Sequence, residues 1–214
     1  MNDLLLNLFT GTDQNSPALM FPNLTNGIVY ATDSHALITI PENELLLKYG
    51  TNEKFPNAKK IIDDFSKKLQ SVRVNVADLA KELTKARIEV DKNSIECKEC
   101  QGSGTVKFEY VDKKDINIHY MDGDCPICDG EGSEETDSKF ARITLNMIEK
   151  EDGTQTGIYI DDLYFHPFQL YRLFMVAALK RVDNFEILYD KDHYGKTLSC
   201  FGNIKVLIML MKKQ

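Results

Sequence analysis

The sequence predicts an α+β fold in which helices pack on antiparallel sheets and a β-hairpin module is inserted into the main domain. Residues 167–181 repeat apolar side chains at helical spacing, and three short apolar segments follow at 185–189, 198–201 and 204–211. A helix followed by an antiparallel meander is typical of the α+β class. The inserted module is predicted by a cysteine motif that occurs twice in the middle of the chain.

The length of 214 residues fits one main domain with an insertion, because single domains cluster at about 100 to 150 residues. We expect residues 1–90 and 139–214 to form a discontinuous main domain and residues 91–138 to form the insertion. No apolar run approaches the roughly 20 residues that cross a bilayer, and the start lacks the basic leader of a secretory signal. We therefore expect a cytoplasmic protein without a membrane partner, in a compartment where paired cysteines hold metal more often than they form disulfides.

Short strands and helices are expected before the insertion. In order, they are an amphipathic segment at 3–9, strands near 18–22, at 27–32 and at 36–40, mostly helical spacing across 42–70 with its clearest part at 59–69, and a helix at 76–88. Asp33 and Ser34 form the turn between two of these strands, and Asn75 is a suitable cap for the last helix.

After the insertion, the chain is expected to continue with a strand and then a helix. The elements are a strand at 140–148, a polar turn at 149–153, an extended segment at 157–165 and the helix at 167–181. Pro167 suits the first turn of that helix, because its fixed φ is helical and its missing N–H needs no partner there.

The repeated cysteine motif is the strongest chemical signal in the sequence. Residues 97–104 read CKECQGSG and residues 125–132 read CPICDGEG, so the pattern C-x-x-C-x-G-x-G occurs twice. Each C-x-x-C can direct two thiolates to one ion, and the glycines permit a positive-φ backbone whose amides approach the sulfurs. The motif therefore predicts one structural zinc ion, closed to water and substrate, with the ligands Cys97, Cys100, Cys125 and Cys128.

Other interpretations of the cysteines are open. They could be two free pairs or a redox dithiol, although a redox C-x-x-C normally lies beside a βαβ pattern and does not need duplicated glycines. His119 or Cys200 could replace one of the ligands, although each lies in a predicted strand.

The residues between the two motifs predict the β-hairpin. Segments 105–111 and 116–120 alternate apolar and polar side chains, with a turn at 112–115. Over about 40 residues the module resembles half of the cysteine-rich zinc domain of the J-domain co-chaperones. The His-Pro-Asp tripeptide of a J-domain does not occur in the sequence, so we expect no co-chaperone activity, and a peptide-binding role of the module stays open.

Two segments outside the module resemble a second family. Residues 28–37 read IVYATDSHAL and are similar to the segment ATDGHRL of bacterial sliding clamps, the β subunit of the replicative DNA polymerase. Residues 206–212 read VLIMLMK and are similar to the C-terminal clamp strand YVVMPMR. Ser34, Ala36 and Leu210 differ from the glycine, arginine and proline of the clamps. With the order of elements between them, the resemblance covers about 40% of the chain and implies a sliding-clamp-like domain.

In the clamps these two segments line a pocket that accepts short linear peptides from polymerases and other partners. The resemblance therefore implies a partner-peptide site formed by Thr32, His35, Leu37, Met209 and Met211. Flexible thioethers suit such an apolar groove. We thus expect a DNA-replication accessory protein that binds DNA polymerase or other partner peptides. The alternative is a zinc-stabilised protein-binding adaptor with neither DNA nor ring function.

The clamp resemblance also implies a homo-oligomeric ring that binds DNA without reading its sequence. Clamp helices present Lys and Arg to the phosphate backbone, which permits sliding. A net charge of -7 excludes a generally basic surface but leaves room for a local one. The DNA-facing candidates lie on two predicted helices and are Lys81, Lys85, Arg172, Lys180 and Arg181.

The sequence gives little support for catalysis. Asp33 with His35, or Asp161 with Asp162, could be proposed as acid–base groups. Asp33, however, lies at a turn where carboxylates cap backbone amides, and adjacent aspartates in a strand point to opposite faces. No phosphate-binding glycine loop, nucleophile elbow or HExxH motif occurs. We therefore do not expect an enzyme.

Overall fold

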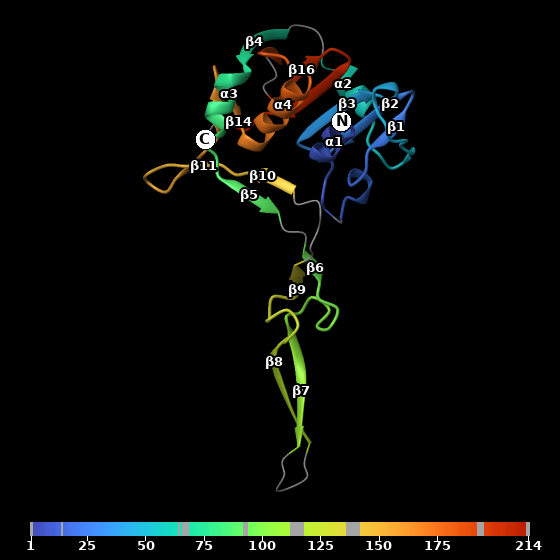
Figure 1. The fold of residues 1–214 in the computed structure, drawn as a ribbon, viewed down its shortest axis with the longest axis vertical. Coiled ribbons are helices and arrows are strands. Elements are labelled where there is room, and N and C mark those ends of the chain that lie inside the picture. The colour runs from blue at the N-terminus through green and yellow to red at the C-terminus, as the bar shows by residue number, and fades with distance from the viewer. Residues whose placement is uncertain are drawn as a thin grey trace. The chain divides into compact units, whose positions relative to one another are not determined.

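The computed structural model describes residues 2–13, 15–63, 65, 69–91, 94–111, 118–135, 142–191 and 195–212. The chain separates into two compact units, one of Met1–Glu89 with Leu145–Gln214 and one of Val90–Thr144 (Figure 1). We call them the sheet unit and the cysteine unit. The assignment of 1–90 and 139–214 to one clamp-like domain, and of 91–138 to an inserted domain, stays a prediction.

The sheet unit is built on a seven-stranded sheet. Its strands follow the order β1 (Asn23–Thr25), β2 (Ile28–Thr32), β3 (Ala36–Pro41), β17 (Ile204–Met209), β16 (Lys196–Phe201), β15 (Asn184–Asp190) and β4 (Leu69–Asn75). Each neighbouring pair is antiparallel. β3 and β17, which are far apart in the sequence, therefore lie side by side in the middle of the sheet.

Helices accompany this sheet in the described part of the chain. They are α1 (Asn2–Phe9), α2 (Ala58–Asp63), α3 (Val76–Leu83) and α4 (Pro167–Leu179), with the 3-10 turns η1 (Pro17–Leu19) and η2 (Glu42–Glu44). The Asn75 side chain accepts hydrogen bonds from the first amides of α3, as predicted, and Pro167 begins α4. None of the described helices combines the length and apolarity needed to span a bilayer.

The strands β2, β3 and β17 bury side chains on both faces of the sheet, and alternate residues face opposite sides. Val29 and Ala31 of β2 belong to the core that includes α1 and α4, whereas Tyr30 belongs to a smaller cluster with Ile62 of α2. The same alternation places Leu207 of β17 on the α2 side. Helices α1, α3 and α4 thus cover one face of the sheet, and α2 covers the other.

Two expectations for the first part of the chain are wrong. The strand expected near 18–22 is replaced by η1 and β1. Among the described residues of 42–70, the helical spacing gives η2 and α2 alone, and β4 begins at Leu69. β15 pairs with β4 over its whole length, so strand pairing outweighed the local apolar spacing.

The helix expected at 76–88 ends earlier, at Leu83. The carbonyl oxygen of Arg87 accepts a hydrogen bond from the Asn146 amide. The backbone at Arg87 therefore bonds to a distant segment and does not continue the helix. The strands that follow form two-stranded sheets: β5 (Ile88–Asp91) with β10 (Arg142–Leu145), β11 (Ile148–Glu149) with β12 (Gln155–Thr156), and β13 (Ile158–Ile160) with β14 (Leu163–Phe165). The strand expected at 140–148 is thus divided between β10 and β11, and its first residues lie outside the described part.

The cysteine unit contains the predicted hairpin. β7 (Thr105–Val111) pairs with β8 (Ile118–Asp124), and β6 (Ser94–Glu96) pairs with β9 (Ser133–Glu135). The expected turn at 112–115 lies outside the described residues. The Phe108 ring covers Gly123 on the opposite strand, where a Cβ would lie 2.9 Å from the ring. A larger residue at Gly123 would therefore displace the Phe108 ring from the hairpin.

Candidate functional site: a four-cysteine centre and an apolar pocket

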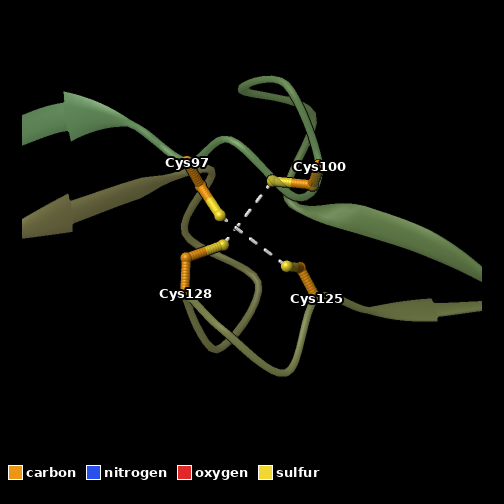
Figure 2. Close-up of side chains that lie close together, drawn as sticks. All are labelled: Cys97, Cys100, Cys125 and Cys128. Atoms are coloured by element: carbon orange, nitrogen blue, oxygen red, sulfur yellow. Dashed lines mark hydrogen bonds between the residues drawn. The ribbon is translucent and has the colours of Figure 1, made fainter.

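Four buried cysteine side chains meet in the cysteine unit (Figure 2). Their sulfur atoms all lie within 4.8 Å of one another, with 3.9 Å between Cys97 and Cys125 and 3.7 Å between Cys100 and Cys128. Four sulfurs about 2.3 Å from one ion lie about 3.8 Å apart at the corners of a tetrahedron. The arrangement is therefore compatible with one metal ion and is too wide for disulfides, whose sulfurs are about 2.05 Å apart.

The two loops that carry the cysteines have matching conformations and bond to each other. The amide of Cys125 donates to the carbonyl oxygen of Gly104 at 2.8 Å, and that of Cys97 donates to the carbonyl oxygen of Gly132 at 2.9 Å. Figure 2 shows the side chains converging from both loops. The repeated motif thus builds one site from two equivalent halves.

The motif glycines are required where the loops approach each other. Gly104 and Gly132 have φ of +73° and +76°. A Cβ at Gly104 would overlap the carbonyl oxygen of Gly130, and one at Gly132 would overlap that of Gly102. The amide of Gly132 also donates to the Cys128 sulfur at 3.2 Å. A larger residue at either position would therefore push the loops apart and remove the amide from the sulfur.

The thiols of the cluster differ in their pKa. Burial raises the pKa of Cys100, but hydrogen bonds from the Gly104 amide and the surrounding cysteines outweigh it and bring the pKa to about 7. Burial raises the pKa of Cys128, and the hydrogen bond from the Gly132 amide does not compensate. Cys100 therefore ionises more readily than Cys128, and a bound cation would stabilise the thiolate form.

The structure separates the alternatives for the cysteines. All four sulfurs meet in one cluster, which favours a shared metal site over two free pairs. Cys200 is exposed on β16 and does not belong to the cluster. The side chain of His119 lies outside the described part of the structure.

A second candidate site is an apolar pocket of about 370 Å³ in the sheet unit, a volume typical of ligand pockets. Thr32, His35, Leu37 and Met209, all expected at the partner-peptide site, line it. Met211 does not line it, and its amide donates to the carbonyl oxygen of Tyr164 at 2.9 Å. The remaining lining residues are Leu19, Ser34, Ala36, Pro56, Ala58, Ile61, Lys196 and Leu207.

Only some of these additional lining residues could have been predicted from the sequence. Alternation along β17 could have identified Leu207, because it lies two residues before Met209 and shares its face. Pro56 and Ile61 come from the loop before α2 and from α2 itself, and their packing over the sheet follows from no local pattern.

The two clamp-like segments meet at the pocket because β3 pairs with β17. Leu37 lies opposite Leu207, and Ala36 lies opposite Ile208. The pairing continues beyond β3, where the carbonyl oxygen of His35 accepts a hydrogen bond from the Met209 amide at 2.9 Å. Residues from both segments thus form one continuous wall.

The β2–β3 turn at the edge of the pocket is tightly bonded. The hydroxyl of Thr32 donates to the carbonyl oxygen of Ala36 at 2.7 Å and accepts from the Ser34 amide at 3.2 Å. One carboxylate oxygen of Asp33 accepts from the amides of His35 and Ala36 at 3.0 and 2.9 Å. Ser34 has a φ of +78°, in the left-handed region, at the position where the clamp segment has glycine.

An ion pair with the buried side chain of Arg172 anchors this turn. Its side chain is fully buried, and its guanidinium donates to the other carboxylate oxygen of Asp33 at 2.5 Å and to the Gln169 side chain at 2.9 Å. The prediction that Arg172 faces DNA is therefore wrong, because its charge is neutralised inside the protein. Asp33 likewise forms no acid–base pair with His35, since its carboxylate is occupied by Arg172 and backbone amides.

The other basic candidates lie at or near the protein surface, and the three lysines have acidic partners. Lys81 forms an ion pair with Asp78 at 3.3 Å, and Lys85 forms one with Glu82 at 2.6 Å. In both pairs the partners are three positions apart in the sequence. Lys180 pairs with Glu44 at 2.9 Å. Arg181 follows α4 and is exposed. DNA binding by these four residues stays a prediction.

No protein-family model and no curated protein matches the sequence. Among solved structures, the chain is similar to DNA polymerase III β subunits: that of Borrelia burgdorferi in complex with a natural product, with 10% identity and a TM-score of 0.45, and that of Thermotoga maritima, with 11% and 0.43. The Helicobacter pylori β clamp bound to a DNA ligase peptide has 10% identity and a TM-score of 0.44. Each match covers 99% of this chain and 60%, 64% and 62% of these proteins, so the chain spans less than two thirds of their length.

Proposed function

We propose that the protein is a sliding-clamp-like accessory protein of DNA replication that binds a short linear peptide of a polymerase or another partner. One observation carries the proposal. The two segments with clamp resemblance, 28–37 and 206–212, contribute neighbouring strands that open onto one apolar pocket. Corresponding segments line a peptide pocket in the clamps, and Thr32, Leu37 and Met209 line the pocket here.

The chemistry of the pocket supports a peptide ligand with an apolar anchor. Leu37 and Leu207 form its inner wall, and Met209, whose side chain is 47% exposed, lies at its edge. An apolar side chain that enters the pocket gains about 25 cal/mol for each Å² removed from water. The thioether of Met209 can adapt to side chains of different shape, which suits a site for several partners.

We also propose that the ion of the cysteine centre is Zn²⁺. Four thiolates at tetrahedral spacing are a donor set that zinc prefers, and closed coordination leaves no position for water or substrate. The ion would hold the two loops together through Cys97, Cys100, Cys125 and Cys128. Its role is structural, in agreement with a binding protein.

Met209→Ala is expected to weaken peptide binding about tenfold, because it removes an apolar side chain from the edge of the pocket. The Met209 side chain is partly exposed, so the fold should tolerate the change. Peptides are first selected on the wild-type protein from a phage library of random decapeptides. Their dissociation constants are then measured by fluorescence anisotropy for wild-type and variant proteins.

Leu46→Ala is the matched control, since Leu46 is 85% exposed and does not line the pocket. It should leave the dissociation constants unchanged. A selection that enriches no peptide, or peptides that bind wild-type and Met209→Ala equally well, would refute the proposed site.

A second candidate function is a zinc-stabilised protein-binding adaptor without DNA or ring function. It is favoured by the ion pairs of Lys81, Lys85 and Lys180 with acidic neighbours and by the burial of Arg172. These interactions leave less positive charge for a phosphate backbone than the sequence suggested.

Light scattering and DNA retention distinguish the two functions. A clamp-like protein should assemble into a closed homo-oligomer at micromolar concentration and should remain on circular DNA with an affinity that falls steeply as salt is added. If the protein is a strict monomer that does not associate with DNA at low salt, the clamp function is refuted and the adaptor function is retained.

A further inference from the structure

We infer that the partner peptide carries an acidic side chain within one or two residues of its apolar anchor, and that Lys196 pairs with this carboxylate. The inference rests on the proposed peptide-binding function and adds the charge of the ligand to it.

The pocket is locally positive in an acidic protein. Among its described lining residues Lys196 is the one with a permanent charge, and no Asp or Glu lines it. The carboxylate of Asp33, next to the lining residue Ser34, is occupied by Arg172 beneath the turn. The chain as a whole has a net charge of -7. Charge complementarity therefore favours an acidic peptide at this place and disfavours a basic one.

Lys196 is positioned beside the apolar wall. It begins β16 and lies directly opposite Met209 of β17. Its ammonium group lies 3.5 Å from the carbonyl oxygen of Ile61 and 5.7 Å from the centre of the Phe65 ring. No ion pair joins it to another described residue. These contacts hold the ammonium group near α2, and it can still form an ion pair with a carboxylate of a bound peptide.

The distance between Lys196 and Met209 determines where the acidic residue of the peptide must lie. Side chains directly opposite in an antiparallel pair have Cβ atoms about 4.5–5.5 Å apart. An extended peptide rises about 3.3 Å per residue. A peptide whose anchor packs on Met209 therefore brings a carboxylate to Lys196 when the acidic residue is one or two positions from the anchor.

The test repeats the selection from random decapeptides with wild-type protein, Lys196→Glu and Lys196→Met. Wild-type protein should enrich peptides with Asp or Glu within two positions of a large apolar residue. Lys196→Glu should enrich Lys or Arg there, and Lys196→Met should show no preference. The peptide that binds wild-type protein most tightly is also synthesised with Lys in place of its acidic residue. This variant peptide should bind about fivefold more weakly, and the difference should shrink in 0.5 M NaCl.

Lys205→Glu is the control, because Lys205 is exposed on β17 but does not line the pocket. It should keep the wild-type preference. If peptides are enriched and lost in Met209→Ala but show no acidic preference, or one that Lys196→Glu does not change, the inference about Lys196 is wrong while the proposed function stands. If no protein enriches any peptide, both are wrong.

Discussion

Cys125→Ser is expected to lose the metal ion and to unfold the cysteine unit, while the seven-stranded sheet stays folded. In the described part of that unit, the buried apolar cluster consists of the four cysteines with Val106 packed against them. The described residues of the unit thus offer no other apolar core to replace the ion. Structural zinc contributes about 10–16 kcal/mol of apparent binding free energy to the folding of small modules. Metal content by mass spectrometry and limited proteolysis followed by mapping of the cleavage sites measure both effects.

Cys200→Ser is the matched control, since Cys200 is the exposed cysteine outside the cluster. It should keep one equivalent of zinc and the wild-type cleavage pattern, whereas a strong chelator added to wild-type protein should reproduce the pattern of Cys125→Ser. Less than half an equivalent of zinc in wild-type protein purified without chelator would exclude the zinc site. A cysteine unit that stays protease-resistant in Cys125→Ser would exclude the structural role of the ion.

Arg172→Met is expected to lower the free energy of unfolding by about 3 kcal/mol, the lower end of the range for breaking a buried ion pair. The arginine is fully buried, and its loss removes the donor to one carboxylate oxygen of Asp33 and to the Gln169 side chain. The lower end applies because the Asp33 side chain is 18% exposed and water can reach it. Urea unfolding followed by circular dichroism measures the change.

The double variant Asp33→Asn with Arg172→Met should lose less stability than the sum of the single variants, because no unpaired charge remains. Glu44→Gln is the control, because Glu44 of η2 pairs with Lys180 at the end of α4, the helix that carries Arg172. It breaks a partly exposed pair with Lys180 and should cost about 1 kcal/mol or less. Equal losses for Arg172→Met and Glu44→Gln would contradict the role of the buried pair.

The pair also predicts a pH dependence. Burial raises the pKa of Asp33, but the charge of Arg172 and the hydrogen bonds to Arg172, Ala36 and His35 outweigh it, so the pKa in the folded protein lies below the ordinary 3.8. The carboxylate therefore contributes stability that is fully present above about pH 4 and is lost as the pH falls through the folded pKa. The stability difference between wild-type protein and Asp33→Asn should shrink below pH 4.

The sequence predicted the parts of the sites that short motifs encode. The four cysteines were identified because C-x-x-C-x-G-x-G combines ligands with the glycines their loops require, as the close approach of Gly104 and Gly132 to the opposite loop shows. Thr32, His35, Leu37 and Met209 were identified from two segments whose neighbours in the fold are fixed by one strand pairing.

The parts that depend on packing could not be predicted locally. Arg172 looked like a surface cation because arginines on amphipathic helices usually reach water. Its burial depends on Asp33, which is far away in the sequence, and on the aromatic rings of Phe9 and Phe168 near its guanidinium. β4 was missed for a similar reason, since its strand conformation comes from its partner β15.

The pairing of β3 with β17 has a consequence for the protein during its synthesis. β3 ends at Pro41 and β17 begins at Ile204, so the β3 half of this pocket wall is made long before the β17 half. At about 5–20 residues per second, a ribosome needs on the order of ten to thirty seconds to make the chain between them. A nascent chain that already displays Thr32 and Leu37 therefore has no pocket. A partner that requires both strands of the wall binds only molecules in which this long-range pairing is complete, and its binding distinguishes finished protein from unfinished or misfolded chains.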